Sequence, residues 1–241
     1  MKATADVAIV GGGVIGLALA RELSSRGADV LVIERGRTGA EASSAAAGLL
    51  SAQSDAVAPS GFFDLALESR DLYPDWTAAL LQETGQDAGW RRTGVLRVGG
   101  EQSLARFEWQ VAAGLPVERL DARGVARVSG GRAAVCIDRG LFFPADAVVH
   151  SRELVGALRR SLDLREVPVE EGVLVTRFTI EGGVCRGLET SAGSVSCGRV
   201  VDAAGAWANL DPTLPFAIPV EPIRGQIVLL AGAALPTVLE S

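Results

Sequence analysis

Hydrophobic and polar positions along the first 34 residues follow the pattern of a strand, a helix and a second strand. Val7–Val10 is an apolar, β-branched run that predicts a buried parallel strand. Glycines follow, and the spacing of leucines over Val14–Arg26 predicts a helix. Gly27 is placed to end this helix, and Asp29–Ile33 predicts the second strand. The amino-terminal region is therefore predicted to form a βαβ unit.

The middle of the chain mixes helical and strand patterns. Apolar residues at helical spacing predict three helices, over residues 62–84, 102–113 and 151–162. We expect Pro74 to bend the first of them and Ser151 to cap the amino-terminal end of the third. Short apolar runs predict strands over residues 95–98 and 141–143.

Strand patterns dominate after residue 173. Val173–Glu181 and Val184–Thr190 flank Gly182-Gly183, a dipeptide typical of a hairpin turn. Further extended segments are predicted over residues 194–197, 200–203 and 218–230. These helices and strands, taken together, imply an α/β fold in which the domains are interleaved along the sequence.

Composition limits the classes of protein that the sequence fits. The 241 residues include 23 basic and 29 acidic ones, so we expect no basic surface for nucleic acid. The longest apolar run, Val7–Ala20, is broken by glycines and is shorter than the ~18 residues of a membrane-spanning helix. Three cysteines, an odd number, suit a reducing compartment. We therefore expect a cytoplasmic protein with no membrane span.

Two common kinds of catalytic site find no support in the sequence. His150 is the only histidine, and the spacing of Cys136, Cys185 and Cys197 fits neither a zinc site nor a redox pair. A Ser-His-Asp triad is not expected either, because no GxSxG nucleophile motif occurs. We therefore assign no metal ligand and no catalytic triad.

Gly11, Gly13 and Gly16 match the GxGxxG spacing of a dinucleotide-binding turn. The first glycine allows a tight turn after the strand, the second lets the backbone approach a pyrophosphate, and the third lets the helix pack closely on the sheet. The amino terminus of the helix then offers N–H groups and a partial positive charge to the phosphates. The spacing therefore predicts a dinucleotide site after the first strand.

Glu34 lies at the end of the second predicted strand, where a carboxylate can accept hydrogen bonds from the hydroxyls of a ribose. The same carboxylate would repel a 2′-phosphate, which disfavours NADP although Arg35 and Arg37 lie nearby. This fingerprint does not distinguish FAD from NAD. An NAD-dependent dehydrogenase would account for Gly11 to Glu34 and would leave the motifs further along the chain without a purpose.

Two of those motifs resemble the FAD-dependent amine and amino-acid oxidases, the family with the D-amino-acid oxidase fold. They are the run SAAAGL at residues 44–49 and the run VVDAAGAW at residues 200–207. Residues 62–73 and the run PIRGQ at residues 222–226 are similar to segments of its glycine oxidases, the thiamine-pathway branch. The resemblance extends from residue 6 to the end of the chain and is most specific in the amino-terminal motifs.

The resemblance implies a Rossmann-like FAD-binding domain that is interleaved with a mixed-sheet substrate domain. The first is expected at residues 1–85 and 142–212, and the second, which is incomplete, at residues 86–141 and 213–241. Cofactor contacts are implied for Gly11, Gly13, Val14, Ile15 and Gly16 at the pyrophosphate, Glu34 and Arg35 at the adenosine ribose, Ala42 and Ser43 on the phosphate side, Ala47, Gly48 and Leu49 along the isoalloxazine, Val173 at the adenine through its backbone, and Ala204 and Gly205 under the flavin.

The implied activity is the oxidative deamination of glycine or another small amine or amino acid. A hydride passes to flavin N5, and O2 reoxidises the flavin and gives H2O2; a link to thiamine biosynthesis is also implied. The catalytic residues are unassigned, because the arginine for the substrate carboxylate is expected beyond Ser241, which suggests a C-terminally truncated chain. Trp207 could lie near the flavin but is expected in the core, and Arg224 could replace the missing substrate arginine but is expected to be structural.

Several alternatives stay open at this point. The substrate could be sarcosine or a D-amino acid, because the residues that would shape the substrate pocket match only weakly or are absent. A flavin-binding fragment without catalytic competence is a second class of function. The sequence also leaves open whether the flavin is attached covalently and whether the chain forms a homo-oligomer.

Overall fold

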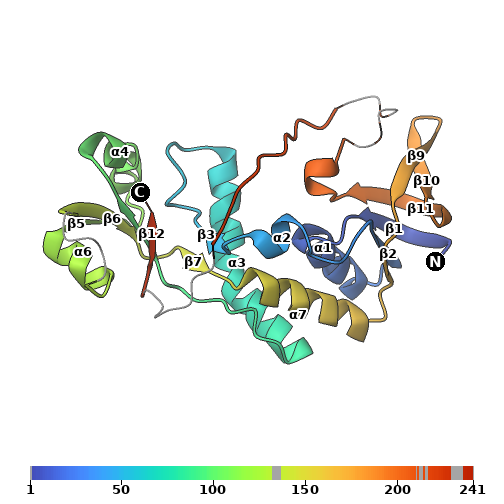
Figure 1. Cartoon of the computed structure of the whole chain (residues 1–241), viewed down its shortest axis with the longest axis horizontal. Coiled ribbons are helices and arrows are strands. Elements are labelled where there is room, and N and C mark those ends of the chain that lie inside the picture. Colours follow the sequence, from blue (N-terminus) through green and yellow to red (C-terminus); the bar gives the residue numbers. More distant parts are fainter. Residues whose placement is uncertain are drawn as a thin grey trace. The chain divides into compact units, whose positions relative to one another are not determined.

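A computed structural model describes residues 2–131, 137–209, 211, 214, 217–228 and 236–240 (Figure 1). The chain forms two compact, discontinuous units. The first unit consists of Met1–Ala47, Ala79–Ala88 and Ser151–Ile227, and the second of Gly48–Ala78, Gly89–His150 and Val228–Ser241. The expected domains are also discontinuous, but these units group residues 48–78 with the second body rather than the first. Which unit serves which functional role stays a prediction.

The first unit is built on a six-stranded sheet. In sheet order its strands are β8 (Val169–Glu171), β2 (Val30–Glu34), β1 (Thr4–Val10), β11 (Gly193–Asp202), β10 (Val184–Thr190) and β9 (Val175–Glu181). The first four strands run parallel, and β10 and β9 are antiparallel to their neighbours. Helices α1 (Val14–Ser25) and α7 (Ser151–Leu164) lie side by side in this unit (Figure 1).

The core of this unit follows from the apolar strands that the sequence predicts. Leu31, Ile33 and Ala8 of the parallel strands are fully buried, together with Leu188 of β10. The predicted βαβ unit is confirmed, and so is the hairpin at Gly182-Gly183, whose two glycines both have positive φ. Because β1 is paired on both sides, the turn that follows it is fixed by two neighbouring strands.

One prediction about this sheet is wrong. Residues 194–197 and 200–203 are not two strands, because β11 runs without a break from Gly193 to Asp202. A Cβ at Gly198 would lie 3.1 Å from the carbonyl oxygen of Asp6 in β1. The glycine therefore reflects the close approach of the neighbouring strand and does not mark a turn.

The second unit contains two small sheets. The larger has the strand order β12 (Val238–Glu240), β4 (Val95–Val98), β6 (Arg139–Phe143) and β5 (Glu118–Asp121), and the smaller pairs β3 (Leu49–Leu50) with β7 (Ala147–Val148). Its helices are α4 (Glu101–Ala105), α5 (Glu108–Ala112) and α6 (Ala122–Val128), together with most of α3 (Gly61–Thr84), which the two units share. The strands predicted at residues 95–98 and 141–143 are confirmed.

The helix predicted over residues 102–113 is two helices, α4 and α5. The break occurs at Phe107, which is buried and makes an edge-to-face contact with Phe143, with ring centroids 5.7 Å apart. The structure also contains β3, β5, α6, β7 and β12, which the sequence patterns did not predict. Residues 218–228 form no strand, whereas residues 229–230 and Cys136 lie outside the described part of the chain.

The other two long helices occur where the sequence predicts them. α3 continues through Pro74, and the hydroxyl of Thr77 donates a hydrogen bond of 2.7 Å to the carbonyl oxygen of Tyr73. α7 begins at Ser151 itself, and the Ser151 hydroxyl donates to the carbonyl oxygen of Ala46. Its expected role as the helix cap stays a prediction. In the part of the chain that the structure describes, no helix is both long and apolar enough to cross a membrane.

Candidate functional site

The turn after β1 is held by backbone contacts on both sides. The Gly11 N–H donates to the carbonyl oxygen of Ile33 in β2 (2.8 Å), and the Ala203 N–H donates to that of Val10 (2.8 Å). Gly11 has a φ of +108°, and an added Cβ would overlap the carbonyl group of Ala203. A Cβ at Gly16 would in turn overlap the carbonyl oxygen of Gly11. The fold itself therefore requires glycine at both positions.

Gly13 differs from these two glycines. Its backbone is extended, with φ −79° and ψ 179°, and it is the N-cap of α1 with no side-chain cap. A Cβ there would meet only the hydroxyl oxygen of Ser43, at 3.1 Å. That hydroxyl accepts a hydrogen bond from the Val14 N–H (3.0 Å). Packing within the protein therefore does not require a glycine at position 13, whereas the close approach of a ligand to the helix terminus would.

Glu34 stands at the carboxyl end of β2 with both carboxylate oxygens held. Oε2 accepts from the Gly12 N–H and Oε1 from the Gly36 N–H, each at 2.7 Å. A carboxylate has about four acceptor positions, so capacity remains for the two hydroxyls of a ribose. The side chain is thus oriented before any ligand arrives.

The loop after β2 returns to the site through a short helix, α2 (Ala42–Ala45). Helix α7 holds this segment: Ser151 Oγ donates to the carbonyl oxygen of Ala46 (2.7 Å), and Arg152 Nε donates to that of Ser44 (3.3 Å). The loop therefore depends on a helix more than a hundred residues away in sequence, a contact that no local pattern indicates.

The turn after β11 forms the opposite wall. Asp202, its last residue, accepts a hydrogen bond from the Ala204 N–H (2.9 Å), and burial raises the pKa of this carboxyl. A 3-10 turn, η1 (Gly205–Trp207), follows. Trp207 is half-buried here and lines the cavity, which corrects its expected place in the core. The Arg35 guanidinium carbon lies 3.6 Å from the centre of its ring.

These elements surround a cavity of about 990 Å³ in the first unit. Most of the residues expected to bind the cofactor line it: Gly11, Gly13, Val14, Ile15, Glu34, Arg35, Ala42, Ser43, Val173, Ala204 and Gly205. Gly16 lies behind the turn, and Ala47 is not among the lining residues. Gly48 and Leu49 belong to the second unit. Arg224, expected to be structural, lies in the lining as well.

Val173 lines the cavity beside Glu34. Its N–H donates to the carbonyl oxygen of Glu34 (3.0 Å), and its expected backbone contact with the adenine stays a prediction. Val173 therefore also fixes the position of the strand end that carries Glu34.

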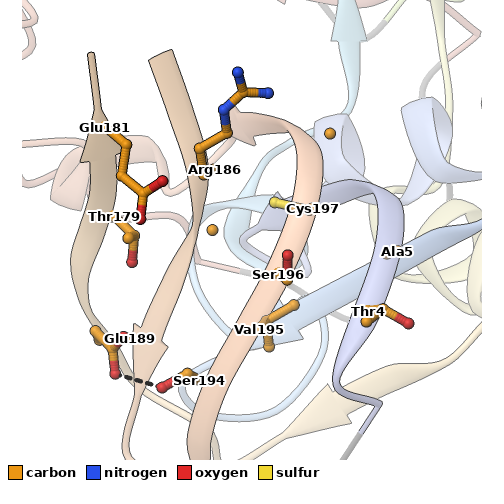
Figure 2. Close-up of a pocket in the computed structure, with 12 residues that line it drawn as sticks. Thr4, Ala5, Thr179, Glu181, Arg186, Glu189, Ser194, Val195, Ser196 and Cys197 are labelled. Atoms are coloured by element: carbon orange, nitrogen blue, oxygen red, sulfur yellow. Dashed lines mark hydrogen bonds between the residues drawn. The ribbon is translucent and has the colours of Figure 1, made fainter. Parts of the chain in front are cut away.

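A second cavity, of about 600 Å³, lies on the sheet of the same unit and has a different character. Figure 2 shows polar side chains of neighbouring strands along it, including Glu181, Arg186 and Glu189. Ser194 Oγ donates to Glu189 Oε2 at 2.7 Å. It contains neither a helix terminus nor a residue expected to bind the cofactor, so the cavity at Gly11–Ile15 is the better candidate site.

Comparison with known families agrees with this geometry. The model of the family described as "FAD dependent oxidoreductase" matches residues 6–239. The chain belongs to this family. The family's cofactor is FAD, and the glycine turn, the carboxylate at Glu34 and the size of the cavity fit the adenosine diphosphate half of that molecule.

The chain is similar to curated proteins named "Bifunctional protein ThiO/ThiG" and "Glycine oxidase". It is 34% identical over its full length to the "Bifunctional protein ThiO/ThiG" of Synechocystis, of which it covers 36%. It is 33% identical over 93% of its length to the "Glycine oxidase" of Geobacillus kaustophilus, of which it covers 61%. The chain thus spans from about a third to three fifths of the length of these relatives.

Solved structures of the same family give the same fold. Glycine oxidase from Geobacillus kaustophilus matches with a TM-score of 0.81 and 32% identity. The enzyme from Bacillus cereus matches with a TM-score of 0.78 and 33% identity. Each comparison covers 86% of this chain and 57% of the other, so the expected D-amino-acid oxidase fold is confirmed.

Proposed function

We propose that the chain supplies the FAD-binding part of an oxidase that deaminates glycine or another small amine or amino acid. The observation that carries the proposal is the cavity at Gly11–Ile15 in a chain about one third identical to glycine oxidases. We also propose that the residues expected to bind the cofactor do so, including Ala47, Gly48 and Leu49, which are not among the residues that line the cavity of the first unit.

The chemistry assigned to the bound FAD is hydride acceptance from the substrate α-carbon and the return of both electrons to O2, giving H2O2. The substrate amine becomes an imine, which water hydrolyses to an oxo-acid and ammonia. The chain's own residues bind and orient. The α1 terminus faces the pyrophosphate charge, Glu34 accepts from the ribose hydroxyls, and Ser43 contacts the phosphate side.

Three further statements belong to the same proposal. The relatives named ThiO/ThiG support a role in thiamine biosynthesis. The odd number of cysteines, of which Cys185 and Cys197 are free thiols, supports a cytoplasmic location. O2 is the co-substrate, and a homo-oligomer stays a prediction.

A second candidate is flavin binding without turnover. Sarcosine and D-amino acids remain alternative substrates for the first candidate.

The two candidates are separated by expressing the chain, recording its visible absorption, and measuring H2O2 release with glycine, sarcosine and D-alanine in parallel. A flavin spectrum together with peroxide from glycine supports the oxidase. A flavin spectrum without peroxide from any of the three supports the second candidate. Protein that takes up no FAD contradicts both.

A further inference from the structure

Arg35 occupies an unusual position at one end of the cavity. Its guanidinium lies 3.6 Å from the centre of the Trp207 ring, within van der Waals contact of the ring face. Arg35 Nη2 also donates to Glu41 Oε1 at 2.9 Å. All three residues line the same cavity. The guanidinium is therefore held by an aromatic face and by a carboxylate, although about a third of its side chain is exposed.

These two contacts restrict the Arg35 side chain before a ligand binds. A free arginine side chain loses rotamer entropy when it is immobilised, and here Trp207 and Glu41 have already restricted it. A guanidinium is planar and weakly hydrated, and it stacks on flat rings as well as forming ion pairs. The Arg35 guanidinium therefore presents a flat face of fixed orientation to the cavity.

The surroundings favour a flat base over a phosphate as the group that meets Arg35. The carboxylates of Glu34 and Glu41 both line this cavity, and Glu41 already neutralises part of the Arg35 charge. Beyond them the wall is apolar, with Val173, Leu174 and Val175 lining this cavity. A second anionic group would be repelled here, whereas a neutral aromatic ring would find one cationic and several apolar contacts.

We propose that Arg35 positions the adenine ring of the bound dinucleotide, and that Trp207 acts through Arg35 by holding its guanidinium. This inference deepens the proposed function and rests on it for the identity of the ligand. It assigns Trp207 a role in holding Arg35, a contact that the sequence did not indicate, and it gives Arg35 a contact with the base rather than with the ribose.

The test compares ligands that contain adenine with one that does not. The binding of ADP, FAD and FMN to flavin-free protein is measured by calorimetry for wild type, Arg35→Ala, Arg35→Lys and Trp207→Leu. Stacking of a base is worth about 1–3 kcal/mol, and 1.4 kcal/mol corresponds to tenfold, so we expect ADP and FAD to bind about tenfold more weakly to Arg35→Ala. FMN should bind all variants equally well.

The lysine variant separates stacking from simple charge. Arg35→Lys keeps the charge and loses the planar group, so it should lose most of the affinity for ADP that Arg35→Ala loses. Arg37→Ala is the matched control, because it removes an arginine that is exposed on the same loop. This control should change ADP affinity less than about twofold. Trp207→Leu should show part of the loss, and Trp207→Phe, which keeps a ring, should restore affinity.

Three outcomes would overturn the inference: unchanged ADP affinity in Arg35→Ala, full affinity in Arg35→Lys, or an equal loss for FMN. If Trp207→Leu does not fold, the comparison of Arg35→Lys with Trp207→Phe still decides. A wild-type protein that binds ADP but releases no peroxide contradicts the oxidase proposal and leaves this inference intact. If the wild-type protein binds FAD and Arg35→Ala leaves the ADP affinity unchanged, this inference fails and the proposed function still stands.

Discussion

The glycine turn of the first unit and the buried polar cluster of the second are both tightly fixed, but by different means. Around Gly11 and Gly16, backbone groups lie so close together that a single Cβ would not fit. In the second unit, the side chains of Gln53, Arg70 and Asp146 bind one another in a region with almost no access to solvent.

The hydrogen bonds of that cluster connect segments that are far apart in sequence. Asp146 is fully buried, and its two carboxylate oxygens accept from the backbone N–H groups of Gln53 (3.2 Å) and Ser54 (2.8 Å). Arg70 Nη1, from α3, donates to Asp146 Oδ1 (3.1 Å), and Gln110 Nε2 donates to the Gln53 carbonyl oxygen (2.8 Å). The comparison shows that one region is specified by local backbone shape and the other by partners brought together from a distance.

The largest effect is expected from Asp146→Ala, which would break the cluster in the second unit. The substitution removes the buried carboxylate that pairs with Arg70, which then keeps only Gln53 and the exposed Asp71 as partners. It also leaves two backbone donors without acceptors, and removing one partner of a buried ion pair costs about 3–5 kcal/mol. Urea unfolding followed by circular dichroism measures this loss of stability.

Asp71→Ala is the matched control for that measurement. Asp71 pairs with the same arginine at 3.0 Å, but its side chain is 65% exposed. An exposed pair contributes ~1 kcal/mol or less, so this variant should resemble wild type. Equal losses in the two variants would show that burial does not distinguish these pairs.

A second test compares two glycines of the first unit. Gly16→Ala places a methyl group onto the Gly11 carbonyl oxygen and should destabilise the protein by about 3 kcal/mol, the upper range for overpacking. Gly13→Ala meets only the Ser43 hydroxyl at 3.1 Å, so its stability should change by less than about 1 kcal/mol.

For ligand binding, in contrast to stability, the larger direct effect is expected from Gly13→Ala. Gly13→Ala puts a methyl group into the cavity at the helix terminus that is proposed to bind the pyrophosphate, so FAD affinity should fall although the fold is intact. Thermal unfolding with and without added FAD measures both effects. A Gly13→Ala protein that is stabilised by FAD as much as wild type would contradict the assignment of this turn.

These contrasts explain how much of the molecule the sequence could predict. The βαβ unit, the cavity residues Gly11, Gly13 and Glu34 and the hairpin at Gly182-Gly183 all depend on local spacing, which is visible in one sequence. The same holds for α7, whose one apolar face gives the helical period. Ala42 and Ser43 were expected only from the resemblance to a known family, and they line the cavity as well.

The parts that the sequence could not predict depend on neighbours distant in the chain. β11 looked like two strands because Gly198 resembles a break, and only the neighbouring β1 explains it. Trp207 looked like a core residue because nothing local indicates that Arg35 lies over its ring. β5 and β12 are strands of three or four residues whose pairing partners define them more than their own sequences do.

The smallest expected loss of stability concerns Glu83 of α3. Its carboxylate binds Arg21 of α1, Ser161 of α7 and Arg165, which directly follows α7. Burial alone would raise the pKa of this carboxyl, but hydrogen bonds from Arg165, Ser161 and Arg21, with the Arg21 charge, outweigh it and lower the pKa to about 2. The contacting atoms lie 2.6 to 2.9 Å apart. Because the pKa is lower in the folded state, the carboxylate stabilises the protein above its ordinary value of 4.5, and this contribution is lost as the pH falls towards 2.

Glu83→Gln should therefore lower the free energy of unfolding by about 1 kcal/mol at pH 7, a shift of about 2–4 °C in Tm. The deficit relative to wild type should shrink as the pH falls from 4.5 towards 2, because the wild-type carboxyl then becomes neutral as well. Glu22→Gln is the control, since Glu22 forms a largely exposed pair with Arg26 and should show almost no deficit at any pH. A Glu83→Gln deficit that is the same at pH 7 and pH 3 would mean that the packing of the side chain, and not its charge, holds the helices of the first unit together.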